Sequence, residues 1–350
     1  MGSNSSGKQS IIFRNKPVVT GAYSVVGKKE GQGPLKKWFD LCLEDDTYGE
    51  KTWEKSESKM LKTAIEKAVL NSGLEMENID LIFSGDLLNQ IMSSAFMARD
   101  LKKPFLGIYG ACSTMTEALL LSSAFVEGGF MDNVAAAASS HYCTAERQFR
   151  MPLEHGNQRP PWAGWTATAA GAMIVSKKSI ENSKITVPEK KEIFVTSATI
   201  GKIIDTGMKD ANQMGAAMAP AAVDTILNHF VDMKRDISYY DMIFTGDLGF
   251  IGSEIAADLL IDAGINKALV KERYFDCGAL LYEKEQDVHG GGSGCGCSAS
   301  VYTSYIYKSM QRGHIKKVLL ISTGALLSTI SPFQGESIPG IAHAVSLEIE

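Results

Sequence analysis

A short motif that occurs twice is the feature that most limits what this chain can fold into. The first copy is Ile79-Asp-Leu-Ile-Phe-Ser-Gly-Asp-Leu87 and the second is Tyr240-Asp-Met-Ile-Phe-Thr-Gly-Asp-Leu248. Each is an apolar run typical of a buried strand, and each breaks at Gly-Asp. Each also follows a stretch with apolar residues at helical spacing, around residues 61–69 and 219–227. The sequence therefore predicts a helix–strand unit that is present twice.

A second pair of segments repeats in the same order. Cys112-Ser113 begins a helical run that ends at Gly128, before a small-residue strand at 133–139. Cys297-Ser298 begins another that ends at Gly313, with the same Cys-to-Gly spacing, before a strand at 317–322. The two echoes together indicate a duplicated β-α-β fold, with chance similarity of two α/β segments as the alternative. Such order predicts right-handed crossovers and helices on both faces of the sheets.

The division of the chain follows from this repeat. The N-terminal half is expected to span residues 8–185 and the C-terminal half 186–350, with the boundary inside the polar stretch 176–191. Residues 1–7 are interpreted as a flexible leader or the remnant of an expression tag. Residues 141–166 carry little periodicity and are expected to form a long excursion over the surface, a common way to cover a site.

Two more strands are expected in buried positions, near residues 105–109 and 279–283.

Charge and cysteine content exclude several classes of protein. The net charge of −5 and the pI of about 5.8 argue against a nucleic-acid binder, which would show a basic footprint. Six cysteines in 350 residues form neither a disulfide framework nor CxxC pairs, so no metal site is predicted. Neither a secretory signal nor an apolar run of about 18 residues is found, so any membrane contact is expected to be peripheral.

Cys112 is the first candidate for chemistry. It follows the apolar segment 105–109 and precedes a helix, so it is predicted to lie at a strand-to-helix turn. The free N–H groups of a helix N-terminus lower a thiol pKa and bind anions. This placement suits a nucleophile or a carboxylate site, while a buried structural cysteine is the alternative.

A glycine-rich run, His289-Gly-Gly-Gly-Ser-Gly-Cys-Gly-Cys-Ser298, is the second candidate. Its glycines allow close backbone approach. It lacks the spacing of a phosphate-binding loop, and no second cysteine pair completes a metal site. A disulfide of one of its cysteines with Cys112 or Cys277 stays open at this point.

The chain resembles the thiolase superfamily in the order of its two halves. The first half has a strand, then a Cys, then a helix, and the second half has a glycine-rich turn. In that superfamily a first-half Cys is acylated, a His in a Gly-Gly-(x)4-Gly-His motif activates it, and a late Cys acts as acid or base. Cys112 matches the first position. The His position falls on Cys297, and the late Cys position falls near 322–326, where no Cys occurs. The third loop position, 245–248, has neither His nor Asn.

These departures predict a thiolase-like fold without thiolase chemistry, because a Cys nucleophile needs a base and an oxyanion hole. The layered arrangement implied by the resemblance is α-β-α-β-α, built from two βαβαβαββ halves. His289 and His141 are the remaining candidates for a base, and a surface or core position is the alternative for each. A Cys-dependent acyl-CoA transferase or condensing enzyme is kept as the alternative function, and a structural subunit of a membrane complex as a third.

A set of six motifs in order, between Gly110 and Ser328, resembles the stage V sporulation protein AD family. They are Gly110-Ala-Cys-Ser-Thr114, Thr144-Ala-Glu-Arg-Gln-Phe-Arg150, Met218-Ala-Pro-Ala-Ala222, Phe244-Thr-Gly-Asp-Leu248, the run 290–298 and Thr323-Gly-Ala-Leu-Leu-Ser328. The resemblance implies non-catalytic binding of dipicolinic acid, alone or with calcium, and no cofactor. It further implies membrane-embedded partners from the stage V sporulation A operon, a homodimer, and a peripheral place on the spore inner membrane.

A flat aromatic dianion needs cationic or N–H donors and an apolar wall. The ligand-binding residues predicted on that ground are Cys112, Ser113, His141, Arg147, Lys202, Asp205 and Cys297, with Arg150 and Arg159 as further cations in the excursion. Asp86 and Asp247, the acids of the repeated Gly-Asp, are expected to cap helices.

Overall fold

The computed structural model describes residues 4–149, 159–177 and 191–349, which form two halves with the same order of elements. The first half consists of β3 (Val18–Val26), α1 (Trp53–Ser72), β5 (Leu81–Gly85), α2 (Met92–Leu101), β6 (Phe105–Gly107), α3 (Thr114–Glu127), β7 (Asn133–Ser140) and β9 (Ala169–Ser176). The second consists of β10 (Ile193–Thr199), α5 (Met214–Met233), β11 (Met242–Thr245), α6 (Gly249–Asp262), β12 (Tyr274–Asp276), α9 (Cys295–Val301), β14 (Lys317–Ala325) and β15 (Gly340–Ile349). Each half is βαβαβαββ, as predicted. The predicted boundary near residue 185 lies outside the described residues.

The strand order is the same in both halves. It is β6-β5-β7-β9-β3 in the first and β12-β11-β14-β15-β10 in the second. In each half the first three strands of this order pair with one another in parallel. The fourth strand pairs antiparallel with both of its neighbours, the third and the fifth strand. The two five-stranded sheets meet where β10 pairs with β3 at a single residue pair, Phe194 and Val18.

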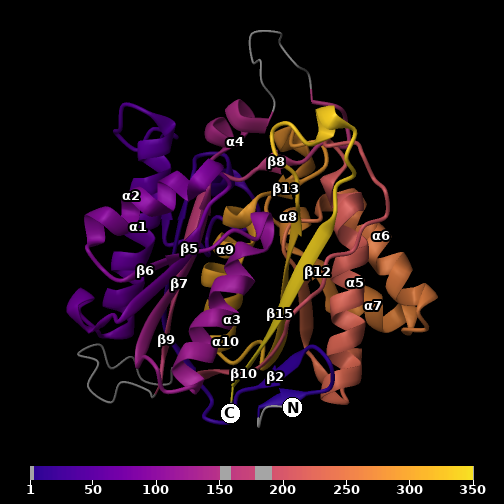
Figure 1. The fold of residues 1–350 in the computed structure, drawn as a ribbon, viewed down its shortest axis with the longest axis horizontal. Coiled ribbons are helices and arrows are strands. Elements are labelled where there is room, and N and C mark those ends of the chain that lie inside the picture. Colours follow the sequence, from indigo (N-terminus) through magenta and orange to yellow (C-terminus); the bar gives the residue numbers. More distant parts are fainter. Residues whose placement is uncertain (1–3, 150–158, 178–190, 350) are drawn as a thin grey trace.

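The helices form three layers around these sheets (Figure 1). Helices α1 and α2 cover the outer face of the first sheet, and α5 and α6 cover the outer face of the second. Helix α3 packs against both sheets, and α9 packs beside it. Beyond α9 the chain continues through a π-helical turn (Tyr302–Ile306) into α10 (Tyr307–Gln311). The result is the predicted α-β-α-β-α layering.

Two of the predicted strands differ in the structure. Strand β6 is short and partly exposed rather than buried, because it is the edge of its sheet and pairs only with β5. The segment predicted as a strand near 279–283 instead contains the end of helix α8 (Cys277–Leu280). The Asp276 side chain accepts from the backbone N–H of Ala279 and so caps that helix.

The described part of the N-terminal leader is ordered. Ser5–Ser6 forms β1, which pairs with β2 (Ser10–Ile12), and β2 pairs with β10. The Asp232 carboxylate accepts from the backbone N–H groups of Lys8 and Gln9. Of the expected leader, Ser5–Ser6 thus lies in a strand.

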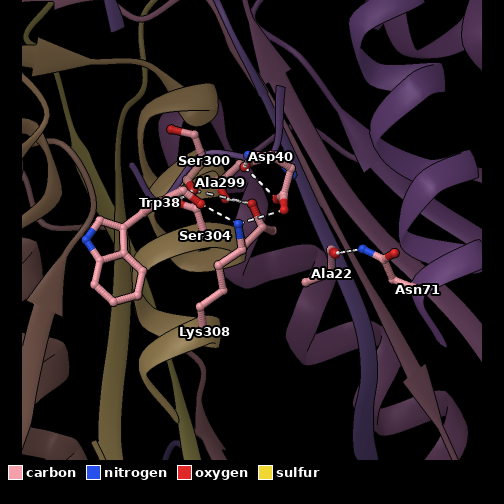
Figure 2. A network of polar contacts seen from close by, with 10 residues as sticks. Ala22, Trp38, Asp40, Asn71, Ala299, Ser300, Ser304 and Lys308 are labelled. Carbon is pink, nitrogen blue, oxygen red and sulfur yellow. Dashed lines mark hydrogen bonds and ion pairs between the residues drawn. The ribbon is translucent and has the colours of Figure 1, made fainter. Parts of the chain in front are cut away.

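A polar network ties the two halves together (Figure 2). The Lys308 ammonium of α10 lies 2.6 Å from the Asp40 carboxylate and donates to the Trp38 carbonyl. Asp40 in turn accepts from the backbone N–H and the hydroxyl of Ser24 on β3. This ion pair holds the C-terminal half's central helix against the N-terminal half. Among the described residues, every helix is too short or too polar to cross a bilayer.

Candidate functional site

Cys112 lies where β6 gives way to α3, as predicted. A single 3₁₀ turn, Ala111–Ser113, joins strand to helix, and Cys112 is 5 % exposed. Ala111 has a φ of 51°, in the left-handed region that costs a non-glycine residue about 1–2 kcal/mol. Strained backbone of this kind concentrates at functional sites. The turn that carries Cys112 is therefore a candidate binding or reaction centre.

Asp247, two residues after the end of β11, is the charged neighbour of Cys112. Its carboxylate lies close enough to the thiol for each group to shift the pKa of the other. The same carboxylate accepts from the Gly294 N–H at 2.8 Å and from the Thr323 hydroxyl at 2.8 Å. Burial raises the pKa of Asp247 to about 6. Asp247 therefore joins three segments of the second half to the cysteine turn of the first half.

The environment of Cys112 does not activate its thiol. Burial, followed by the negative charge of Asp247, raises the pKa of the Cys112 thiol well above its usual value. The predicted lowering of this pKa by the helix N-terminus is wrong, because lost hydration and a neighbouring carboxylate outweigh the helix dipole. At physiological pH Cys112 is therefore a neutral thiol.

The glycine-rich turn packs against the first half too closely for side chains. A Cβ on Gly294, whose φ is 95°, would lie 2.8 Å from the Ser140 hydroxyl, and one on Gly296 would lie 2.4 Å from the Ala169 carbonyl. Cys297, one residue further, is fully buried, with its sulfur 3.6 Å from the Gly246 carbonyl oxygen. Burial raises the pKa of Cys297 well above its usual value. All six cysteines are free thiols, so the disulfides left open with Cys112 and Cys277 do not form.

A cavity of about 500 Å³ opens at the Cys112 turn. Its aromatic and apolar lining includes Tyr109, Phe149, Met214 and Phe333. The charged residues among its described lining are Glu146, Lys209 and Asp210, of which only Lys209 is a cation. The volume falls within the range of roughly 300–1,000 Å³ that is usual for small-molecule sites.

His141 is held away from a catalytic role by its own hydrogen bonds. Its Nε2 lies 2.8 Å from the Asp46 carbonyl oxygen, and its Nδ1 accepts from the Cys143 N–H. The ring is completely buried, and burial lowers its pKa. His289, the other candidate base, pairs with Asp287 at 3.1 Å. Among the described residues, the cavity lining contains no histidine.

The predicted cationic ligand residues have partners outside the cavity. Arg147 forms an ion pair with Glu54, and Lys202 forms one with Asp224 at 3.2 Å. Asp205 accepts from the Ser337 hydroxyl at 2.5 Å. None of Arg147, Lys202 and Asp205 belongs to the described cavity lining. That these three residues contact a ligand stays a prediction, and their positions outside the cavity lining do not support it.

The remaining predicted residues lie either at the cavity or in the interior around it. Ser113 is buried and its hydroxyl donates to the Gly110 carbonyl, so it shapes the turn rather than the cavity surface. The structure thus brings Cys112 to the cavity and places Ser113, His141 and Cys297 in the surrounding interior. Arg150 lies outside the described residues.

The two repeated aspartates have different roles. Asp86 accepts from the backbone N–H groups of Leu88 and Ser94 and so caps α2, as expected. Asp247 does not cap α6, because Asp276 accepts the Leu248 and Gly249 N–H groups instead. Asp247 is the residue whose importance the sequence analysis missed. Its place in the repeat was visible, but its contact with Cys112 was not.

Comparison with known proteins decides the family. The model of one family, described as Stage V sporulation protein AD, matches residues 7–348. The chain belongs to the stage V sporulation protein AD family. A relative of that name from Bacillus subtilis (strain 168) is 43 % identical over 343 residues, which cover 98 % of this chain and 97 % of the relative.

Solved structures share the fold of this family member at low sequence identity. 3-Oxoacyl-[acyl-carrier-protein] synthase III from Aquifex aeolicus VF5 matches with a TM-score of 0.55 and 14 % identity, covering 95 % of this chain and 99 % of the synthase. A variant of Xanthomonas campestris OleA gives 0.58 and 11 %, over 96 % and 99 %. Human mitochondrial 3-ketoacyl-CoA thiolase in complex with CoA gives 0.54 and 12 %, over 96 % and 98 %. The thiolase-like fold predicted from the sequence is confirmed.

Proposed function

We propose that this protein binds dipicolinic acid in the Cys112 cavity without converting it, for uptake into the developing spore and release at germination. The observation that carries the proposal is the cavity itself. It opens at the turn that matches the nucleophile position of thiolases, where the Cys112 thiol is neutral and lies near the Asp247 carboxylate. Family membership supports a role in sporulation. A site with aromatic walls and an unreactive thiol suits binding better than acyl transfer.

The charges around the cavity favour the calcium complex of the ligand. Free dipicolinate carries two negative charges at neutral pH, whereas its one-to-one calcium chelate is neutral. The described lining has one ammonium, Lys209, and two carboxylates, Glu146 and Asp210. A neutral chelate avoids repulsion from the carboxylates, while Tyr109 and Phe149 offer flat surfaces for the pyridine ring.

Calorimetry with dipicolinate, with and without calcium, tests this proposal. We expect saturable binding that is tighter with calcium. Lys209→Ala should weaken binding about tenfold, as expected for the loss of one charge-assisted hydrogen bond. The matched control is Lys202→Ala, which removes a lysine paired with Asp224 outside the cavity lining and should leave the affinity unchanged. A folded protein that releases no heat with either ligand form would refute the proposal.

The alternative is a Cys-dependent acyl-CoA transferase or condensing enzyme. The fold shared with a synthase and a thiolase, together with the position of Cys112, favours it. Incubation with an acyl-CoA, followed by intact-protein mass spectrometry, separates the two. Stable acylation of Cys112 with turnover would establish the enzyme, whereas an unmodified chain supports the binding protein.

We also propose that the protein acts as a homodimer on the spore inner membrane, with the membrane proteins of the stage V sporulation A operon. Strand β6 is an open sheet edge, and Leu106 and Tyr109 beside it are 46 % and 45 % exposed. An open edge with exposed apolar residues suits pairing with a second copy. Light scattering should give the dimer mass for the wild type and the monomer mass for Leu106→Asp. A monomeric wild type would refute the dimer.

A further inference from the structure

A group of cationic and aromatic side chains lies beside the cavity and is not used by the proposed site. Its centre is Trp165 on β8 (Trp165–Thr166), the short strand that pairs with β13 (Gly292–Ser293) near α4 (Tyr142–Phe149) (Figure 1). Thr166 and Ser293, on the same two strands, line the Cys112 cavity. The group is therefore built on the frame of the cavity wall.

Three side chains surround the Trp165 indole. The Tyr142 ring stacks on it with centroids 3.8 Å apart and an interplanar angle of 12°. The Lys29 ammonium lies 3.6 Å from the indole centroid and the Arg159 guanidinium carbon 4.4 Å from it. Because Tyr142 fills the space over one face, both cations lie over the opposite face. Two positive groups thus share one side of a single ring.

The hydrogen-bonding capacity of these cations is only partly used. Arg159 donates through Nη2 to the Asp287 carbonyl at 3.1 Å, but its Nη1 is buried without a hydrogen-bond partner. The described residues also provide no hydrogen bond or salt bridge to the Lys29 ammonium. A buried guanidinium nitrogen without an acceptor is destabilising, because it has lost its hydrogen bonds to water without gaining others. Both cations therefore keep donors that an anionic oxygen can accept.

Two of the three acids near the pair are hydrogen-bonded or ion-paired to other groups. Burial, and next the charge of Arg159, lower the pKa of Lys29, although Asp287, Glu30 and Asp46 act in the opposite direction. The Asp287 carboxylate is engaged by His289. Glu30 accepts from the Tyr282 hydroxyl and the Thr168 N–H, and burial raises its pKa to about 7.

We propose that Lys29 and Arg159, held over Trp165, form a second anion-binding site that takes the carboxylate or phosphate oxygens of a small molecule. The indole fixes both cations by cation–π contact, so little side-chain freedom remains to be lost on binding. The site stands apart from the proposed function, since none of Lys29, Arg159 and Trp165 lines the cavity.

Tryptophan fluorescence reports on this site directly, because an anion bound to the two cations changes the electrostatic environment of the Trp165 indole. We titrate the full chain with inorganic phosphate and, separately, with dipicolinate. A saturable change is expected with at least one of them. Lys29→Met and Arg159→Met should each weaken that binding at least about tenfold. Trp165→Phe should remove the optical signal.

A matched control is available elsewhere in the chain. Arg312 lies 5.0 Å from the Trp38 centroid in another cation–π pair, and Arg312→Met should change neither signal nor affinity. Thermal melting checks folding: the bound anion should raise Tm of the wild type but not of Lys29→Met. The phosphate titration separates this site from the Cys112 cavity, because its outcome does not depend on dipicolinate binding there.

The proposal is overturned if neither anion gives a saturable signal. It is also overturned if Lys29→Met and Arg159→Met, both folded, bind as tightly as the wild type. A dipicolinate signal that is lost with Lys209→Ala but kept in both methionine variants would assign that signal to the cavity and likewise reject the second site.

Discussion

Replacing Asp247 by Asn should remove a defined part of the pH dependence of stability. Burial raises the pKa of Asp247 from 3.8 to about 6 in the folded protein. An acid with a raised folded-state pKa binds its proton more tightly when folded, so stability falls as pH rises from the unfolded value to the folded one. The shift of about 2 pKa units corresponds to roughly 3 kcal/mol, which is lost completely above about pH 6.

Urea unfolding of the wild type and Asp247→Asn at several pH values measures this quantity. Asn keeps one acceptor oxygen but loses the other, which adds a cost of about 1–3 kcal/mol that does not depend on pH. As pH rises, the free energy of unfolding of the wild type should fall relative to that of Asp247→Asn. About half of the effect, roughly 1.5 kcal/mol, is expected between pH 5 and pH 8.

The other buried carboxyl groups cancel in this comparison because both proteins contain them. Asp258→Asn, which removes an exposed carboxylate of α6, serves as the matched control and should give a profile parallel to the wild type. Parallel profiles for the wild type and Asp247→Asn would refute the reasoning, since they would mean that Asp247 ionises alike in the folded and unfolded chains.

Four further outcomes are expected. Cys112 should react with iodoacetamide far more slowly in the folded protein at pH 8 than in urea, because burial and Asp247 raise the pKa of its thiol. Equal alkylation rates of Cys112, followed by mass spectrometry, would contradict this. Lys308→Met should destabilise by about 2 kcal/mol in urea unfolding, because the Asp40 carboxylate loses its partner in a largely buried place. Lys62→Met, which breaks an exposed pair at 3.9 Å, should cost at most about 0.5 kcal/mol in the same assay. Asp276→Ala should cost about 2 kcal/mol or more, since the backbone N–H groups at the starts of α6 and α8 lose their acceptor; an unchanged unfolding midpoint would argue against that role.

The fold could be predicted because duplication leaves its mark on the order of residues. The Gly-Asp strands became β5 and β11, and the two Cys-to-Gly runs became α3 and the helical stretch that begins at α9. The strand expected near 279–283 failed because a capping aspartate at 276 turns the chain into a helix there. An apolar run alone does not separate a short buried strand from a short buried helix.

The site was harder to predict because distances between side chains are set by packing across the two halves. Arg147 and Lys202 were reasonable cationic candidates from the sequence. In the structure, however, Arg147 forms an ion pair with Glu54 of α1, and Lys202 forms one with Asp224 of α5. Lys209, which does line the cavity, carries no distinguishing motif in the sequence.

The sequence by itself determined the duplicated α/β architecture, the strand-to-helix position of Cys112 and the family resemblance, because each depends on local pattern and order along the chain. Only the tertiary structure decided that Asp247 from the second half meets the Cys112 thiol and raises its pKa. The same holds for the two cations that share the face of Trp165. The physical reason is that burial and charge act through space, so residues far apart in sequence set the ionisation of a group that its own neighbours along the chain do not reveal.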